Sequence, residues 1–261
     1  MAWNADEPYN ELPLLPPRAE FETRAVLKAT VRARTALAAM DEATKRMQNP
    51  MVLVNSLSLL EAQASSEIEN IVTTTDELFR YAQDVADSAT AETKETLRYR
   101  AALFSGMESI RRRPLSVNTA IEVCTNIHRR DIGVRNLPGT IIGNPKTRRA
   151  IYTPPTGEAV IVQKLSNWVA FVHTTADIDP LVVMAITHYQ FEAIHPFTDG
   201  NGRTGRILNV LQLVEAGLLR EPILYLSRFI IQSKDEYYRL LLGVTAEEAW
   251  EDWILFVLRG I

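Results

Sequence analysis

Apolar residues recur every three or four positions along most of this chain, which is the spacing of amphipathic α-helices. The pattern predicts helices over these ranges: about 20–47, 56–71, 77–85, 93–112, 117–129, 158–174, 180–194, 201–217, 233–242 and 246–258. Asn49-Pro50 is expected to end the first helix, Asp76 to cap the third and Ser116 to cap the fifth. The apolar face of the second helix is expected to consist of Leu57, Leu60, Ala64 and Ile68.

Two segments lack this helical period. Residues 1–20 contain four prolines and are expected to form an extended arm on the surface. Between 133 and 156, glycines and prolines separate two β-prone runs, 140–142 and 150–153, which predict a hairpin with its turn at 144–147. The sequence therefore predicts an all-α, mainly helical fold with one short β-hairpin.

The composition is typical of a globular protein. The 261 residues are 46% hydrophobic and 23% charged, and the formal net charge of −4 gives no reason to expect nucleic-acid binding. Cys124 is the only cysteine, which excludes an internal disulfide and favours a reducing compartment. The amino terminus lacks a basic and apolar leader, and no apolar run reaches the roughly 18 residues of a membrane span. We therefore expect a cytoplasmic protein without a membrane partner.

The chemistry is concentrated in the twelve residues from His195 to Arg206, which directly precede an amphipathic helical pattern. A glycine-rich turn that opens a helix exposes free backbone N–H groups and the positive end of the helix dipole, so it binds anions. Arg203 and Arg206 add fixed positive charge suited to phosphate oxygens. Asp199 is an oxygen ligand of the kind that Mg²⁺ takes beside phosphates, and His195 is a candidate general base. The segment predicts a nucleotide phosphate site with a base beside it.

Other motifs fit this segment poorly. An EF-hand calcium loop starting at Asp199 would need Glu at its twelfth position, where the sequence has Val210. A Walker A loop requires Gly-Lys-Ser/Thr, which is missing, and a dinucleotide fingerprint requires a preceding strand. A purely structural turn explains one or two glycines but not His195, Asp199 and both arginines together.

The segment resembles, without departure, the His-Pro-Phe-x-Asp-Gly-Asn-Gly-Arg-x-x-Arg signature of the Fic family of AMP-transferring enzymes. Further stretches are similar to that family: 12–23, 60–70, 225–227 with 237–238, and 250–254. The resemblance covers almost the whole chain. It implies an amino-terminal helical region, 1–88, followed by a Fic catalytic core, 89–261.

The resemblance implies a protein adenylyltransferase, which transfers AMP from ATP to a Tyr, Thr or Ser hydroxyl of a target protein. His195 would accept the hydroxyl proton, Asp199 would hold Mg²⁺, and pyrophosphate would leave. The ATP-binding residues of the segment would be Gly200, Asn201, Gly202, Arg203, Thr204, Gly205 and Arg206. By the same resemblance, Tyr238 and Trp250 would line the adenine region.

The hairpin, at about 139–155, falls where the family has a flap whose open strand edge pairs with the backbone of the target. In strand addition of this kind, backbone hydrogen bonds align the target strand and depend little on its side chains. The target therefore stays unidentified. Ile151 and Tyr152 are candidates for side chains that clamp the target, with ordinary hairpin packing as the alternative.

Ser65 and Glu69 are four residues apart, so they would share one face of the helix at about 56–71. Beside a complete Fic signature, Ser65-x-x-x-Glu69-Asn70 resembles the inhibitory motif of the family, with Asn70 in place of the usual glycine. Its place upstream of the signature is that of the class with an amino-terminal inhibitory helix. Glu69 would then pair with Arg206 and keep it from the γ-phosphate of ATP.

Other functions are left open at this point. The same site could transfer another nucleotide or phosphate group, or remove AMP from a modified target. The chain could also be a weakly catalytic, ATP-binding regulatory module. Some relatives have a carboxy-terminal winged-helix domain, whereas this sequence ends inside a predicted helix, which indicates a shortened chain. The expected partners are ATP and a target protein, which can be the chain itself, with a homodimer as one option.

Overall fold

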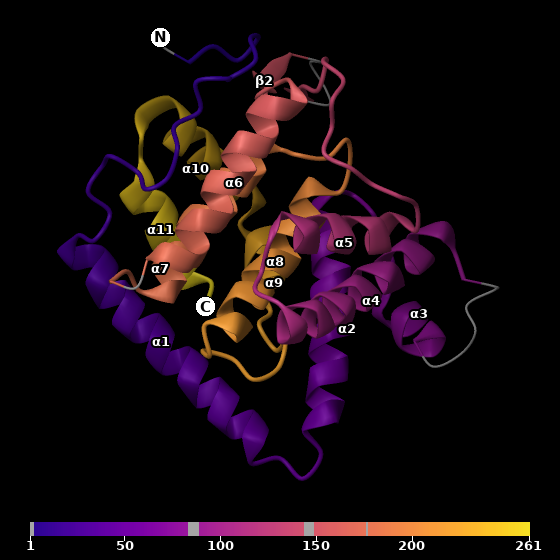
Figure 1. Ribbon diagram of the computed structural model, residues 1–261. Helices are drawn as coiled ribbons and strands as arrows, with labels where there is room; N and C mark the ends of the chain where they lie inside the picture. Colours follow the sequence, from indigo (N-terminus) through magenta and orange to yellow (C-terminus); the bar gives the residue numbers. More distant parts are fainter. Residues whose placement is uncertain (1–2, 83–88, 144–148, 176) are drawn as a thin grey trace.

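The computed structural model describes residues 3–82, 89–143, 149–175 and 177–261. In these residues it contains eleven α-helices and one two-stranded antiparallel sheet, so the predicted all-α fold with a single hairpin is confirmed (Figure 1). The elements are α1 (Arg24–Lys45), α2 (Pro50–Ile68), α3 (Thr75–Tyr81), α4 (Ala91–Arg112), α5 (Val117–His128), β1 (Ile142–Gly143), β2 (Ala150–Tyr152), α6 (Glu158–Thr174), α7 (Pro180–Ile194), α8 (Asn201–Glu215), α9 (Leu226–Gln232), α10 (Lys234–Glu247) and α11 (Trp250–Arg259).

Local capping explains where several helices begin. Ser116 caps α5 as predicted, in a capping box. α2 begins at Pro50, six residues earlier than predicted, because a proline that ends one helix also fits the first turn of the next. The predicted cap of α3 is wrong: the hydroxyl of Thr74, not Asp76, accepts from the Glu77 N–H. The predicted end of that helix at 85 lies outside the described residues, and the short helix α9 was not predicted.

The inward face of α2 is more polar than predicted. Ala64 and Ile68 are buried as predicted, whereas Leu57 and Leu60 are only half-buried. Four polar side chains of α2 are almost completely buried instead: Ser58, Glu61, Ser65 and Ser66. A helix with this face depends on hydrogen bonds for its placement, since apolar packing alone is non-directional.

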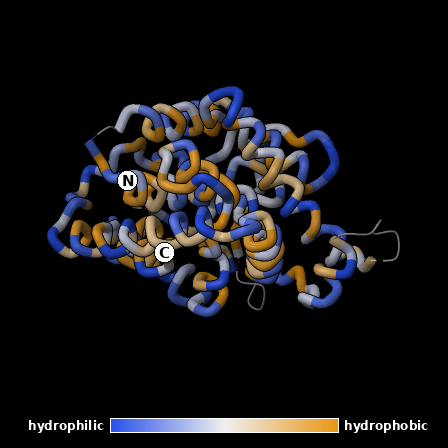
Figure 2. Tube along the Cα trace, turned by 90° about the horizontal axis from the view of Figure 1, so that it is seen from below, coloured by the Kyte–Doolittle hydropathy of each residue, from blue (hydrophilic) through white to orange (hydrophobic). Residues whose placement is uncertain are grey.

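Helices α7 and α8 form the centre of the molecule. α7 packs against α6, α8 and α11, and α8 packs against α4, α5 and α2. Nearly every residue of both central helices is buried. Coloured by hydropathy, the trace shows hydrophobic positions on the inner turns of the helices and hydrophilic ones at the outer connections (Figure 2). The segment His195–Arg206 joins α7 to α8 and therefore lies against the most buried part of the protein.

The amino-terminal arm contains no helix before Arg24, as predicted, but it is bound more tightly than a surface arm. Leu12 and Leu15 are buried in the core. The Lys164 ammonium donates to the Leu12 carbonyl at 2.7 Å, and Gln190 donates to the Pro13 carbonyl at 2.8 Å. These side-chain donors on α6 and α7 replace the sheet or helix partners that an extended backbone lacks.

The predicted hairpin is present as β1 and β2, which pair antiparallel with Ile142 opposite Tyr152. Its predicted turn at 144–147 lies outside the described residues. The Tyr152 hydroxyl donates to the Ala193 carbonyl at 2.8 Å, which ties β2 to the last turn of α7. The hairpin therefore lies beside the start of the His195–Arg206 segment.

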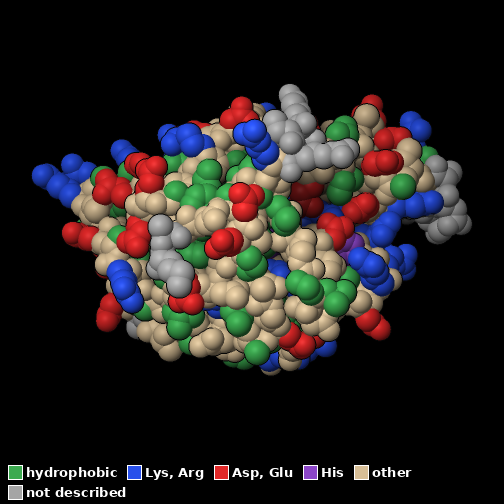
Figure 3. All heavy atoms as spheres, turned by 90° about the horizontal axis from the view of Figure 1, so that it is seen from above, with side chains coloured by type: hydrophobic (Ala, Val, Ile, Leu, Met, Phe, Trp, Pro, Cys, Tyr) green, Lys and Arg blue, Asp and Glu red, His purple; other side chains and the backbone are tan. Residues whose placement is uncertain are grey.

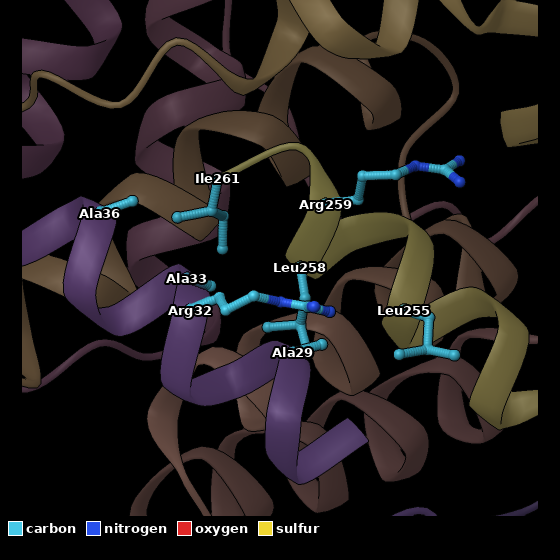
Figure 4. A pocket seen from close by; sticks show the side chains of 8 residues that line it. All are labelled: Ala29, Arg32, Ala33, Ala36, Leu255, Leu258, Arg259 and Ile261. Carbon is cyan, nitrogen blue, oxygen red and sulfur yellow. The ribbon is translucent and has the colours of Figure 1, made fainter. Parts of the chain in front are cut away.

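A groove lies between α1 and α11 (Figure 4), and none of its lining residues belongs to the His195–Arg206 segment. Its lining residues are Ala29, Arg32, Ala33, Ala36, Leu255, Leu258, Arg259 and Ile261. The Arg32 side chain extends across the groove toward α11. Within the described ranges, none of the helices has the length and apolar character needed to cross a membrane.

Candidate active site

His195 is positioned by the backbone at the end of α7. It adopts a left-handed conformation, φ 49° and ψ 59°, and its N–H donates to the Phe191 carbonyl at 3.0 Å. A non-glycine residue in this region needs support from its surroundings. The buried Arg135 provides it: Nε donates to the His195 carbonyl at 2.7 Å, and Nη2 to the carbonyls of Pro155 and Ile194 at 2.5 and 3.3 Å. Arg135 therefore fixes the direction in which His195 leaves the helix.

The His195 imidazole is neutral near pH 7. Burial, and then the charge of Arg135, lower the pKa of His195 to about 4. A neutral imidazole can accept a proton, and a negatively charged substrate bound beside it would raise its pKa and make it a stronger base. A neutral His195 is what the predicted general base requires.

Asn201 holds the turn closed. Its side-chain oxygen accepts from the Phe197 N–H at 2.8 Å, and its side-chain nitrogen donates to the Phe197 carbonyl at 2.8 Å. Phe197 is buried, and the Gly200 carbonyl accepts from the N–H of the fully buried Thr204 at 2.9 Å. The side-chain amide of Asn201 is thus used inside the turn.

Gly200 and Gly202 are required by different constraints. Gly200 caps α8 with φ +78°, a conformation that side chains rarely adopt. A Cβ atom at Gly202 would lie 2.6 Å from Oε1 of Glu69 and 2.8 Å from Nη1 of Arg206. The missing side chain at Gly202 therefore lets Glu69 approach the start of α8.

Glu69 contacts both arginines of the segment. Its Oε1 accepts from Nη2 of Arg206 at 2.9 Å, and its Oε2 lies 2.7 Å from Nε of Arg203. Both guanidiniums are almost completely buried, with 3% and 1% of their side-chain surface exposed. Burial alone would lower the pKa of Arg206, but the Glu69 charge and other neighbours raise it. The predicted Glu69–Arg206 pair is present in the structure, and Arg203 is a partner that was not predicted.

Ser65 holds Arg206 from the same side as Glu69. Its hydroxyl accepts from Nε of Arg206 at 2.7 Å, and its carbonyl accepts from Nη2 at 2.9 Å. Asn70, which follows Glu69, has φ 65°, the left-handed conformation that commonly ends a helix at glycine or asparagine. Asn70 thus occupies a position that glycine would also fill without strain.

Two carboxylates beside the arginines were not identified from the sequence. Glu95 of α4 pairs with Nη1 of Arg203. Glu192 of α7 lies behind α8, where a Cβ atom at Gly205 would come within 2.8 Å of its Oε1. Burial raises the pKa of Glu192 to about 7, although the charge of Arg206 lowers it.

The reason for missing Arg135, Glu95 and Glu192 is the same in each case. Arg135 and Glu95 find their partners 60 and 108 residues away, and the surroundings of Glu192 are set by a neighbouring helix. In the sequence each of them is a single charged residue, and such residues are usually solvated.

Asp199 is the metal ligand that the sequence predicts. Its side chain is 61% exposed at the start of α8, and Oδ1 accepts from the Gly200 N–H at 2.7 Å. Mg²⁺ commonly takes one or two carboxylates together with substrate phosphates and water. In the described part of the chain, no three His, Cys, Asp or Glu side chains lie together in a way that could hold an ion. The role of Asp199 as a Mg²⁺ ligand stays a prediction.

Tyr238 and Trp250, the two residues predicted to line the adenine region, differ in their exposure to solvent. Tyr238 is half-exposed, and the charges of Arg206, Glu192 and Glu69 act on its pKa, which burial raises. Trp250 is buried and packs edge-on against Tyr189 of α7, at 4.9 Å between ring centroids. A role in binding adenine stays a prediction for Tyr238 and Trp250.

The two flap residues differ in exposure. Ile151 is 39% exposed, whereas Tyr152 is 7% exposed and is anchored to α7 by its hydroxyl. This geometry favours ordinary packing for Tyr152 and leaves Ile151 as the side chain that can reach a target.

The space-filling view shows acidic side chains inside a hollow of the surface, with basic side chains and a histidine beside it (Figure 3).

Comparison with known families gives two matches. Residues 27–108 match the Fic/DOC family N-terminal region, and residues 118–213 match the Fic/DOC family. The first match contains Ser65, Glu69 and Asn70, and the second contains the whole His195–Arg206 segment.

Curated relatives are similar over part of their length. The chain is 33% identical over 127 residues to "Protein adenylyltransferase fic-1" of Caenorhabditis elegans, and 31% identical over 121 residues to "Protein adenylyltransferase Fic" of Drosophila virilis. These alignments cover 47% and 44% of this chain and 23% of each relative. The chain thus matches about a quarter of the length of these relatives.

Solved structures share the fold. A Fic family protein from Desulfovibrio desulfuricans G20 superposes with a TM-score of 0.71 at 21% identity, covering 94% of this chain and 74% of that one. Fic-1 from C. elegans gives a TM-score of 0.66 at 19% identity, covering 90% and 70%. At this level of identity the likeness concerns the fold.

Proposed function

The chain belongs to the Fic/DOC family, and from this membership we propose that it is a protein adenylyltransferase held in a self-inhibited state by Glu69. The enzyme transfers AMP from ATP to a hydroxyl group of a target protein. The observation that carries the proposal is the position of the Glu69 carboxylate between Arg203 and Arg206. Two guanidiniums at the start of a helix suit phosphates, and a carboxylate bound to both suits an inhibitor.

In the transfer step, the oxygen of the target hydroxyl forms a bond to the α-phosphorus of ATP. The bond from that phosphorus to the bridging oxygen breaks, and pyrophosphate leaves with the electron pair. His195 accepts the proton of the hydroxyl. The backbone N–H groups at the start of α8 stabilise the charge on the α-phosphate oxygens, as preorganised donors do in phosphoryl transfer.

Residues of this chain also orient the reactants. Arg203 and Arg206 bind the β- and γ-phosphates once Glu69 has left them, and Asn201 keeps the turn in its binding shape. Asp199 would hold Mg²⁺, which when bound supplies positive charge against the phosphates. Arg135 keeps His195 in the left-handed conformation that aims it at the site.

Inhibition follows from competition for Arg206. Three hydrogen bonds from α2 and Glu69 occupy its Nε and Nη2 atoms. A γ-phosphate can take the place of Glu69 on Nη2 only after Glu69 moves. ATP bound with Glu69 in place therefore has its α-phosphorus turned away from attack.

We also propose that the target binds along the hairpin, next to the exposed Ile151. An open strand edge can add a strand from another protein through backbone hydrogen bonds.

The single buried cysteine, Cys124, favours a reducing compartment such as the cytoplasm.

The experiment that tests the proposal compares two labels of ATP. Glu69→Gly protein is incubated with Mg²⁺ and ATP labelled on either the α- or the γ-phosphate, and the protein is analysed by mass spectrometry. Retention of the α label with a mass gain of one AMP supports adenylyl transfer. Retention of the γ label indicates phosphate transfer. ATP binding without any labelled product indicates a regulatory module and contradicts the proposal.

A further inference from the structure

Glu61 is a buried carboxylate of α2 that the transfer reaction does not use. It is 2% exposed, and all its described hydrogen bonds are ones it accepts. Oε2 accepts from the Ser227 N–H at 3.0 Å, while Oε1 accepts from the Ser227 hydroxyl and from the Tyr99 hydroxyl, the latter at 3.3 Å. These partners belong to α9 and α4, so a single carboxylate joins three helices.

Glu61 lies on the same face of α2 as the residues that hold Arg206. Positions 61, 65 and 69 are four apart, and such positions follow one another along one side of a helix. The Ser65 side chain also acts on the pKa of Tyr99, so Tyr99 lies beside both Glu61 and Ser65. From Ser65 the contacts continue to Arg206.

The Ser227 contact fixes both the position of α2 along its axis and its rotation about that axis. Ser227 is the second residue of α9, a helix whose first residues lack a side-chain cap. Glu61 satisfies one of the free N–H groups at that end. Because Glu61 is one of four polar side chains on the buried face of α2, sliding or turning this helix would leave its carboxylate buried without donors, which is unfavourable.

We propose that Glu61 is a positioning residue of the inhibitory contact: by anchoring α2 to α9 and α4, it holds Ser65 and Glu69 against Arg206. Glu61 does not touch the nucleotide site, and it acts through Glu69. The inference rests on the proposed function, because it specifies how inhibition at the same site is maintained. It also makes α9 the element through which movement elsewhere can release α2.

The first test measures activity. Labelled-ATP incorporation is compared for wild type, Glu61→Leu, Glu61→Gln and Glu69→Gly, with Glu67→Leu as a control at an exposed position of the same helix. Glu61→Leu removes every acceptor and should raise incorporation about tenfold, since hydrogen bonds to a charged group contribute this much. Incorporation by Glu61→Gln, whose amide oxygen can still accept from Ser227, should be closer to that of wild type. Incorporation by Glu67→Leu should equal that of wild type.

The double variant Glu61→Leu/Glu69→Gly separates positioning from a general effect. It should be as active as Glu69→Gly, because the inhibitory carboxylate that Glu61 positions is absent from both variants. A change of more than about threefold between those two variants contradicts the inference. The inference is also contradicted if Glu69→Gly is active but Glu61→Leu shows no more incorporation than wild type. Ser227→Ala, which loses one donor, serves as a milder variant if Glu61→Leu does not fold.

Hydrogen exchange tests the inference without relying on catalysis. The peptide covering 61–71 should exchange about tenfold faster in Glu61→Leu than in wild type, while the peptide covering 180–194 should keep its rate. Unchanged exchange in 61–71 overturns the inference. If Glu69→Gly yields no labelled product but exchange rises as expected, the proposed function fails and the anchoring of α2 by Glu61 stands.

Discussion

Oε1 of Glu69 lies 2.9 Å from Nη2 of Arg206, across 137 residues of sequence. Glu69 caps the end of α2 and Arg206 belongs to α8; the Arg206 side chain is 3% exposed and the Glu69 side chain 23%. Removing one partner of such a pair usually destabilises a protein, because a buried charge loses its counterpart. Here Ser65 and other neighbours still surround Arg206, so the loss of Glu69 frees a phosphate ligand.

The first prediction concerns Arg135, whose guanidinium holds the backbone of His195. Arg135→Met in the Glu69→Gly background should reduce kcat by at least about tenfold, because three carbonyls lose their donor and His195 can leave its left-handed conformation. The loss should appear in kcat more than in KM, measured with labelled ATP. An equal rise in KM with unchanged kcat would place Arg135 in nucleotide binding instead.

Asn70 gives a second prediction, about stability and inhibition together. Asn70→Gly should keep wild-type inhibition and change the free energy of unfolding little, since both residues accept the left-handed conformation. Asn70→Val should lower that free energy by about 1–2 kcal/mol and raise basal incorporation. Urea denaturation and the labelled-ATP assay measure the two effects. Equal behaviour of the Gly and Val variants would show that the backbone at Asn70 is not constrained.

The conformation of Asn70 and the geometry of the His195–Arg206 segment follow from short-range sequence. A complete motif places its histidine, carboxylate and arginines within one turn and one helix start, so their proximity needs no knowledge of the fold. The Ser65–Glu69 spacing likewise fixes a shared helix face. The contact of Glu69 with Arg203 was out of reach, because it depends on how far α2 approaches α8 over Gly202.

The pH dependence of activity provides a third prediction. Burial and the Arg135 charge lower the pKa of His195 to about 4, so the neutral base persists well below pH 6.5 in the free enzyme. For Glu69→Gly, the acidic limb of kcat/KM, which reports free-enzyme groups, should therefore lie below the ordinary histidine pKa of about 6.5. An acidic limb at or above 6.5 that remains in Asp199→Asn would contradict a buried, neutral His195.

Glu192 leads to a fourth prediction, on stability. Its pKa is raised to about 7 in the folded protein, mainly by burial, so folding takes up a proton between about pH 4.5 and 7. The free energy of unfolding therefore falls as pH rises through that window. Glu192→Gln removes this loss and should gain stability relative to wild type by up to about 3 kcal/mol between pH 5 and 8. The same wild-type–variant difference at both pH values, measured by urea denaturation, would contradict a raised pKa.

Tertiary packing explains what the sequence left unpredicted. Pro50 was interpreted only as a stop, although it also begins α2, and seven-residue α9 is too short to show a helical period. The inward face of α2 is polar in part, against the usual rule that apolar positions face the core. That face is polar because Glu61 and Ser65 meet donors from α9, α4 and α8, which are distant in sequence.

The most direct test of the account compares initial rates of labelled-AMP incorporation by three proteins at saturating ATP and Mg²⁺: wild type, Glu69→Gly and Glu69→Gly/His195→Ala. We predict that Glu69→Gly exceeds wild type by at least about tenfold, as expected when a buried arginine is released to a phosphate. The double variant should show no incorporation. Equal rates for wild type and Glu69→Gly, or activity that survives His195→Ala, would contradict the account.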